Sequence, residues 1–304
     1  MLFLLNKHCR RLILVGLLVL SLSPQASAFE VGPVTLHGFI NQLFVHTSEN
    51  NYFGSSSNGS WEYREAGLTG FYRITNRSYF SSRVTASQIS NSHGQDILST
   101  QYAFLGFNVV SEHHLDIGLR LGDLQRAHGL YADAIDIPLN RNGVMLPQPL
   151  YYDYARKGGF KYRGAELNFS FRQPWGDLDL LLTIGRPRSQ GSSDAVSRLS
   201  GFYSANSATL TSIAIYESDF VETGEVNGFS SQFKFIYTPP DYRWRFGYSR
   251  TETPGGKSIL TGTSLTSGYQ VVSDLSADLS VVSNYGIEYY LDNWTFTFEY
   301  GTTR

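Results

Sequence analysis

The chain has 304 residues, with 24 Lys and Arg against 26 Asp and Glu. A balance this close to neutral gives no electrostatic footprint for a nucleic-acid partner. A single cysteine, Cys9, excludes a disulfide within the chain and a cysteine cluster that holds a metal.

Residues 1–28 have the order of a secretory signal peptide. Three basic residues precede an apolar stretch over residues 12–22, and the small segment Ala26-Ser27-Ala28 follows. No later stretch approaches the ~20 apolar residues of a transmembrane helix. We therefore expect export and a mature domain over residues 29–304, which has no cysteine and carries 21 basic against 26 acidic residues.

The mature sequence repeats segments of about ten residues in which apolar and polar side chains alternate, the period of a strand with one apolar face. Leu115, Ile117, Leu119 and Leu121, for example, alternate with polar residues and glycine. The predicted strands, in chain order, are residues 35–46, 64–74, 79–89, 100–110, 114–123, 162–172, 177–186, 229–237, 241–251, 283–291 and 294–301.

Short and long connections alternate between these strands. The long ones are residues 47–63, 90–99, 124–161, 187–228 and 252–282. Strands of 9 to 11 residues with short turns at one end and long loops at the other are typical of outer-membrane proteins. The predicted fold is an all-β, antiparallel, up-and-down transmembrane β-barrel with short periplasmic turns and long external loops.

The strand count is the open point of this prediction. Bacterial barrels have an even number of strands, whereas eleven are recognisable, and the sequence ends at Thr303-Arg304 rather than on an aromatic residue. We expect about 12 strands here and an intact barrel of possibly 16, with the sequence truncated at its C-terminus. A hidden strand within residues 187–228, for example residues 208–216, is the alternative.

Aromatic residues gather at the strand ends beside the short turns, where a barrel has its interfacial girdle. A general preference of strands for aromatic residues is the alternative explanation. The expected girdle contains Tyr72, Tyr79, Trp175, Tyr237, Tyr242, Trp244, Tyr289, Tyr290 and Trp294.

If the apolar face meets lipid, the other face looks into the lumen. Glu65, Thr69, Lys234, Glu288 and Glu299 are on that face. Many long charged side chains favour a water-filled interior, and a barrel plugged by its own charge pairs is the alternative. The predicted pore lining consists of Arg73, Arg83, Asp116, Arg120, Glu166, Arg172, Arg243 and Arg245.

The loop at residues 124–161 is rich in apolar and aromatic residues, and we expect it to pack against something. Its motifs resemble those of a group of outer-membrane porins of Gram-negative bacteria, although Ala132 and Ile135 stand where those porins have Asn and Arg. The motifs are Arg120-Leu121-Gly122, Gly129-Leu130-Tyr131, Asp136, Pro138, Arg141, Leu146-Pro147-Gln148 and Tyr151-Tyr152-Asp153.

The resemblance implies a trimeric porin whose third loop folds into the channel. The expected constriction residues are Arg126, Asp133, Asp136 and Arg141, on the loop. Asp133 and Asp136 would then oppose wall arginines Arg83 and Arg120 and create a transverse field. A loop that stays outside in solvent is the alternative.

Enzyme motifs are absent from the sequence: it has no Gly-x-Ser-x-Gly, no His-Glu-x-x-His and no P-loop. We predict a non-enzymatic channel for passive diffusion of small hydrophilic solutes or ions, with no cofactor or metal. Its expected partners are outer-membrane lipids, lipopolysaccharide and small solutes. A structural or adhesive barrel that binds an external partner through polar loops such as residues 55–60 and 189–212 is the alternative.

Overall fold

A computed structural model describes most of the domain that follows the predicted signal peptide. Residues 1–28 and the centre of the 124–161 loop lie outside the described part of the chain. Within the described part, no helix has the length and apolar character needed to cross a bilayer. The described residues are 29–48, 56–88, 97–131, 151, 161–187, 221–226, 228–254, 256–263, 270–277 and 280–304.

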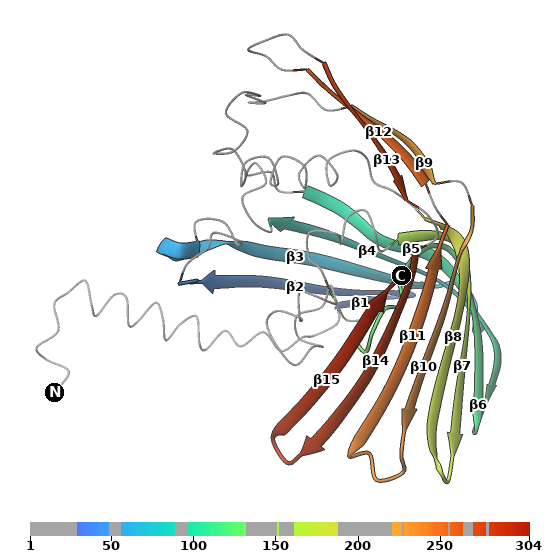
Figure 1. Ribbon diagram of the computed structural model, residues 1–304. Coiled ribbons are helices and arrows are strands. Elements are labelled where there is room, and N and C mark those ends of the chain that lie inside the picture. Colours follow the sequence, from blue (N-terminus) through green and yellow to red (C-terminus); the bar gives the residue numbers. More distant parts are fainter. Residues whose placement is uncertain are drawn as a thin grey trace, which may run out of the picture.

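Twelve strands form one antiparallel sheet whose spatial order follows the chain, as Figure 1 shows. A short 3-10 helix, η1 (Ser56–Asn58), precedes the third strand. The strands are β1 (Phe29–Val31), β2 (Val34–Val45), β3 (Ser60–Arg73), β4 (Ser78–Gln88), β5 (Ile97–Glu112), β6 (Leu115–Gln125), β7 (Lys161–Gln173), β8 (Gly176–Pro187), β10 (Ser230–Thr238), β11 (Trp244–Thr253), β14 (Ser280–Leu291) and β15 (Trp294–Thr303).

All eleven predicted strands are present, with shifted ends. The largest shift is at β3, which begins at Ser60 instead of residue 64. Three other strands begin three residues away from the prediction: β5 at Ile97, β14 at Ser280 and β11 at Trp244 instead of residue 241. The β11 shift has a local cause: Tyr242 has a φ of 54° and its N–H donates to the carbonyl of Pro239 at 3.0 Å. Residues 239–243 are therefore part of the turn.

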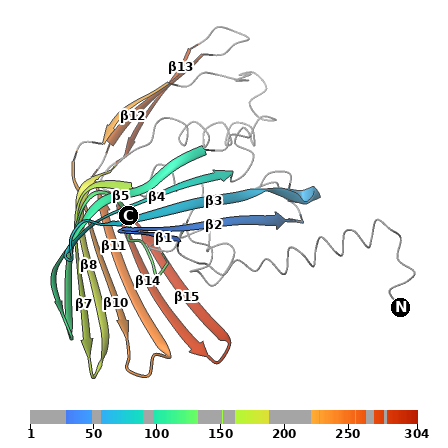
Figure 2. The same cartoon turned by 180° about the vertical axis from the view of Figure 1, so that it is seen from behind.

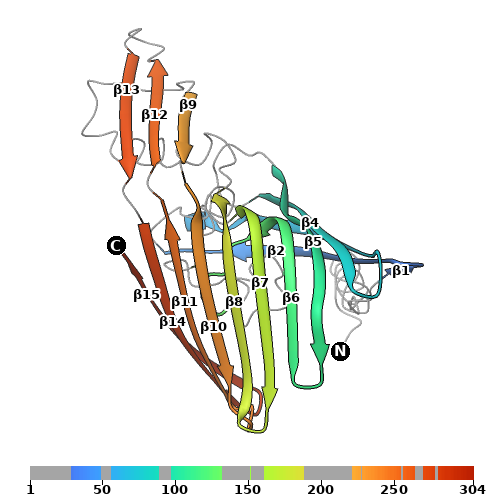
Figure 3. The same cartoon turned by 90° about the vertical axis from the view of Figure 1, so that its right-hand side faces the viewer.

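A second sheet of three strands corrects the prediction that residues 187–228 and 252–282 are long loops, because one of its strands lies in the first range and two lie in the second. Its strand order is β13-β12-β9, and the matching strands of the large sheet have the order β14-β11-β10. The two orders match because β13 precedes β14 in the chain, β12 follows β11, and β9 precedes β10. It extends the large sheet beyond the end opposite the short turns (Figure 3). The predicted strand at residues 208–216 lies outside the described residues. The three strands are β9 (Val221–Val226), β12 (Gly256–Thr263) and β13 (Gln270–Ala277).

The large sheet is strongly curved but not closed (Figures 1 and 2). Among the described strands, β15 pairs with β14 alone and β1 pairs with β2 alone, so the predicted closure is not seen. The two edge strands differ in length, since β15 has ten residues and β1 has three.

The two faces of the sheet have opposite character. On β8, Leu182 and Ile184 are 43% and 55% exposed, whereas Thr183 between them is 4% exposed. The same alternation on β4 and β10 gives an apolar, exposed face and a polar, buried face, the reverse of a sheet that packs an apolar core. Buried polar residues of the second face include Glu65, Arg83, Thr85, Gln101, Glu166, Gln232, Lys234, Ser249, Thr251, Asn284 and Glu288.

Candidate functional site

Residues 126–131, which directly follow β6, lie against the polar face of β10, β11, β14 and β15, and we call that face the inner face. The N–H of Ala127 donates to Oε1 of Gln232 at 2.9 Å, and the N–H of Gly129 donates to Oγ of Ser249 at 2.9 Å. These partners are more than 100 residues away in the sequence. The start of the long loop therefore folds back across the sheet and does not leave it.

Leu130 fits into a gap that two glycines create in the inner face. Gly247 on β11 and Gly286 on β14 are direct register partners. A Cβ at Gly247 would lie 2.4 Å from Cδ2 of Leu130, and a Cβ at Gly286 would lie 2.6 Å from its Cγ. Leu130 itself is buried. We call Gly247 and Gly286 the glycine notch, because any larger residue would displace Leu130.

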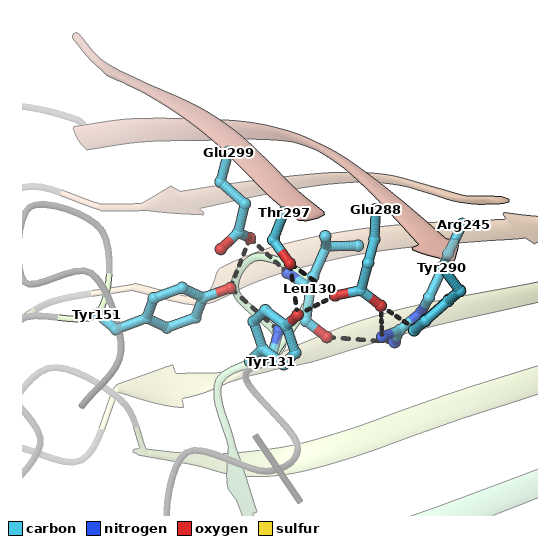
Figure 4. A network of polar contacts seen from close by, with 8 residues as sticks. All are labelled: Leu130, Tyr131, Tyr151, Arg245, Glu288, Tyr290, Thr297 and Glu299. Atoms are coloured by element: carbon cyan, nitrogen blue, oxygen red, sulfur yellow. Dashed lines mark hydrogen bonds and ion pairs between the residues drawn. The ribbon is translucent and has the colours of Figure 1, made fainter. Parts of the chain in front are cut away.

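The backbone of Leu130 is held on both sides of this notch. Its N–H donates to Oε1 of Glu299 at 2.9 Å, and its carbonyl accepts from Nη2 of Arg245 at 3.3 Å. Arg245 also lies 3.8 Å from Oε1 of Glu288, which is 1% exposed (Figure 4). A half-buried carboxylate and a guanidinium thus hold the N–H and the carbonyl of one residue of the loop.

Two tyrosines complete this attachment (Figure 4). The hydroxyl of Tyr131 donates to Glu288, and the hydroxyl of Tyr151 donates to Oε1 of Glu299 at 2.6 Å. The N–H of Tyr131 donates to the Tyr151 hydroxyl at 3.0 Å, so the two tyrosines are also joined to each other. Burial, followed by the charge of Glu299, raises the pKa of Tyr151, so this hydroxyl remains a neutral donor.

The segment Gly129-Leu130-Tyr131, which carries part of the resemblance to porins, has a physical explanation. Gly129 has a φ of 70°, and a Cβ there would lie 2.2 Å from the Tyr151 hydroxyl. Leu130 fills the glycine notch, and Tyr131 reaches Glu288. Each of the three residue types is therefore required by a contact with the wall or with Tyr151.

His128 also belongs to this attachment, although the sequence shows it only as one of several scattered histidines. It is 5% exposed, and a ring nitrogen lies 2.8 Å from Nδ2 of Asn284 on β14. Its ring meets that of Tyr151 edge-on, with centroids 6.0 Å apart. No local pattern marks this role, because the partner is 156 residues away.

A second part of the inner face, on β4 to β8, carries the other predicted arginines. Arg83 is 6% exposed and donates from Nε to Oγ1 of Thr69 at 2.9 Å. Arg120 donates from Nη1 to Oε1 of Glu166 at 2.8 Å, and Glu166 also accepts from Thr183 at 3.4 Å. Predicted lining residues Arg83, Arg120 and Glu166 therefore lie in one region.

These residues line a cavity of about 460 Å³ that reaches across to β10. Its walls combine polar and aromatic residues with aliphatic ones, among them Leu124, Leu180 and Ile236. Its lining includes Tyr79, Ser81, Arg83, Tyr102, Phe104, Arg120, Gln125, Glu166, Asn168, Ser170, Asp179, Leu181 and Lys234.

The remaining predicted lining residues lie apart from this cavity. Asp116 is exposed near the β5–β6 turn and accepts from Oγ of Ser111 at 2.9 Å. Arg172 lies 3.0 Å from Asp179, near the β7–β8 turn. Arg73 is exposed at the end of β3, and Arg243 is in the turn before β11. Arg245, in contrast, contacts residues 126–131, because its Nη2 donates to the carbonyl of Leu130.

Arg126 is the one predicted constriction residue within the part of the chain that the structure describes. It begins the attached segment, and its Nε lies 3.4 Å from Oγ1 of Thr251 on β11. Asp133, Asp136 and Arg141 lie outside the described residues. The expected opposition of loop carboxylates and wall arginines thus stays a prediction.

Sequence reasoning missed the aromatic part of the cavity. Tyr79 was expected in the girdle, but it lines the cavity, because it shares a face with Arg83 four residues on. Tyr290, also expected in the girdle, donates to Glu288 on the inner face. Tyr102 and Phe104 were not singled out, because a bulge in β5 breaks the alternation just before them.

Nothing in the described part of the chain suggests a metal centre. No group of three or more His, Cys, Asp or Glu side chains is placed there to hold an ion. The polar network on the inner face consists instead of hydrogen bonds and ion pairs between the loop and the wall. Such an arrangement can position a loop and line a polar space.

Comparison with known proteins gives little more. No family model and no curated protein matches the chain. A solved structure of OmpT, an outer membrane protein of Vibrio cholerae in a trimer form, is 11% identical over 90% of this chain and 89% of that one, with a TM-score of 0.26. A loop L8 deletion mutant of the same protein is 11% identical over 90% and 94%, with a TM-score of 0.24. At these scores the likeness supports no conclusion about function.

Proposed function

We propose that this chain is a porin-like channel of the bacterial outer membrane, through which small hydrophilic solutes or ions diffuse passively. The observation that carries the proposal is the inverted sheet: its apolar face is exposed and its charged face is buried. In water, an apolar surface over a whole sheet is unfavourable. In a bilayer the same surface meets lipid, and the polar face lines a lumen.

The proposal includes a closed barrel, exported by the signal peptide over residues 1–28 and surrounded by outer-membrane lipids and lipopolysaccharide. Closure would satisfy the open edges of β1 and β15, which a bilayer does not tolerate. The sheet continues beyond its loop end as β9, β12 and β13, an arrangement suited to strands that extend past the membrane surface. Assembly as a trimer is part of the proposal only through the resemblance to porins.

In this proposal the attached segment at residues 126–131 narrows the lumen. Its supports are Leu130 in the glycine notch and the tyrosine contacts with Glu288 and Glu299. A segment fixed in this way occupies space inside the sheet without plugging the cavity on β4 to β8. The solute would then pass between the attached segment and the arginines Arg83 and Arg120.

Single-channel recording tests the proposal. The purified, detergent-folded protein is added to a planar bilayer with a salt gradient across it. Steady open steps are expected, and neutral replacement of both Arg83 and Arg120 by Gln should shift the reversal potential toward cation preference. Arg77→Gln, in the exposed β3–β4 turn, is the matched control and should leave the potential unchanged.

Two results would contradict the proposal at different levels. Folded protein that never conducts would favour a sealed barrel that binds an external partner through its loops. Conductance with an unchanged reversal potential in the double arginine variant would keep the channel but remove these arginines from its path.

A further inference from the structure

Three aromatic rings lie together on the inner face of β4 and β5. The centroids of Tyr102 and Phe104 are 5.3 Å apart, and those of Tyr79 and Phe104 are 6.1 Å apart. All three residues line the cavity. We call them the aromatic floor. Such a floor is unexpected on a face otherwise rich in Ser, Thr, Gln and charged residues.

Two features of the strands build this floor. A bulge in β5 leaves Gln101 as an extra residue, because Arg83 pairs with Tyr102 and Val84 pairs with Thr100. The bulge turns Tyr102 and, two residues further on, Phe104 onto the inner face. Gly106 makes room for Tyr79, since a Cβ there would lie 2.2 Å from Cζ of the Tyr79 ring.

Two arginines lie over this floor. The guanidinium carbon of Arg83 is 4.8 Å from the centroid of Tyr102, and that of Arg120 is 5.2 Å from the centroid of Phe104. Both distances are within the range of a cation–π contact. The rings hold the two cations in fixed positions at one wall of the cavity, so that charge and apolar surface are presented side by side.

The cavity as a whole has an excess of positive charge. Arg83, Arg120 and Lys234 line it, against the carboxylates of Glu166 and Asp179. Lys234 reaches it from β10, on the other side from the aromatic floor, and is 3% exposed. An anion entering this space is therefore attracted from two sides.

From this geometry we propose that the cavity is a binding subsite for a small organic carboxylate that carries a flat apolar ring. The inference rests on the proposed channel function, and it names the class of solute. The carboxylate meets Arg83, Arg120 and Lys234, and the ring lies against the aromatic floor. An inorganic anion would contact only the three cationic side chains, and an uncharged aromatic molecule would contact only the aromatic floor. A volume of about 460 Å³ admits a molecule of this size.

Benzoate is the probe, with acetate and benzamide as partial probes that lack the ring or the charge. Saturation-transfer NMR on the detergent-folded protein measures binding without requiring conduction, and transient blockade in planar bilayers measures it in the open channel. Benzoate should bind more tightly than either partial probe. Phe104→Leu and Tyr102→Leu should each weaken benzoate binding by about five-fold, the size of one aromatic contact.

Phe107→Leu is the matched control, because it lies on the same strand, faces outward and is 37% exposed. It should leave benzoate binding unchanged. Equal binding of benzoate and acetate, or equal weakening by Phe107→Leu and Phe104→Leu, would overturn the subsite. Binding by NMR from a protein that never conducts would keep the subsite and reject the channel, whereas conduction without benzoate binding would do the reverse.

Discussion

The outer and inner faces of the sheet are built from alternate residues of the same strands, but they are specified to different degrees. On the outer face, Leu182 and Ile184 are exposed, and if this face meets lipid as proposed, any apolar residue would serve there equally well. On the inner face, Leu130 meets two glycines and Tyr131 meets a glutamate, so each partner is required by type. The difference teaches that the outer face needs a class of residue, whereas the inner face needs particular residues.

The largest expected effect comes from placing one charge on either face. Leu181 and Leu182 are neighbours on β8, but Leu181 lines the cavity and Leu182 is on the exposed face. Leu182→Arg should lower the free energy of unfolding by about 2–4 kcal/mol, because an arginine near the bilayer midplane is poorly hydrated. Urea unfolding in lipid vesicles measures this cost.

Leu181→Arg is the matched control, since the same side chain there is in the polar cavity. It should cost clearly less than Leu182→Arg. Equal costs at both positions would mean that the two faces have similar surroundings, and the proposed membrane placement would be wrong.

The glycine notch gives the next largest effect. Gly286→Ala places a methyl group against Leu130, and overpacking of this kind costs about 1–3 kcal/mol unless the neighbour moves. We expect the attached segment to be displaced, with a larger single-channel conductance as the readout. Gly247→Ala should act in the same direction.

Gly70→Ala on β3 is the control, because its Cβ would be 3.6 Å from Leu36, an ordinary contact. Leu130→Ala makes the required room, so adding Gly286→Ala to that variant should have no further effect. An unchanged conductance in Gly286→Ala, or an effect that persists without the Leu130 side chain, would show that the notch does not position the loop.

The contrast between the faces also explains what the sequence could reveal. The eleven strands were predictable, because alternation is a local pattern and the outer face follows it from residue to residue. The attachment was not, since Gly247 and Gly286 become a notch only when two strands pair and a segment over 100 residues earlier reaches them. The aromatic floor was hidden for another reason: one bulged residue at Gln101 shifts the alternation that would have revealed it.

Tyr151 gives a smaller effect that depends on pH. Tyr151→Phe removes the hydroxyl that donates to Glu299 and accepts from Tyr131, which should cost about 1 kcal/mol. Burial raises the pKa of Tyr151 above that of the unfolded chain. Its contribution to stability is therefore complete below the unfolded value of about 10 and is lost as the pH rises toward the folded value.

Absorbance at 295 nm measures this titration. The difference between wild type and Tyr151→Phe should show no phenolate signal at pH 10 while the protein is folded. Tyr242→Phe removes one exposed tyrosine from the β10–β11 turn and controls for the loss of a chromophore. A Tyr151 signal at pH 10 in folded protein would mean that its hydroxyl is in water and that the loop is not attached there.

The smallest expected effects come from exchanging leucine for isoleucine on each face. This exchange keeps volume and polarity constant, so it tests whether a face needs a particular residue or only an apolar one. Leu182→Ile on the outer face should change the free energy of unfolding by less than about 0.5 kcal/mol, since lipid adapts to either shape. Leu130→Ile should cost about 1 kcal/mol, because the added branch at Cβ does not fit a gap shaped by Gly247 and Gly286. Measured side by side in urea, equal values would show that the inner face tolerates a change of shape as readily as lipid does.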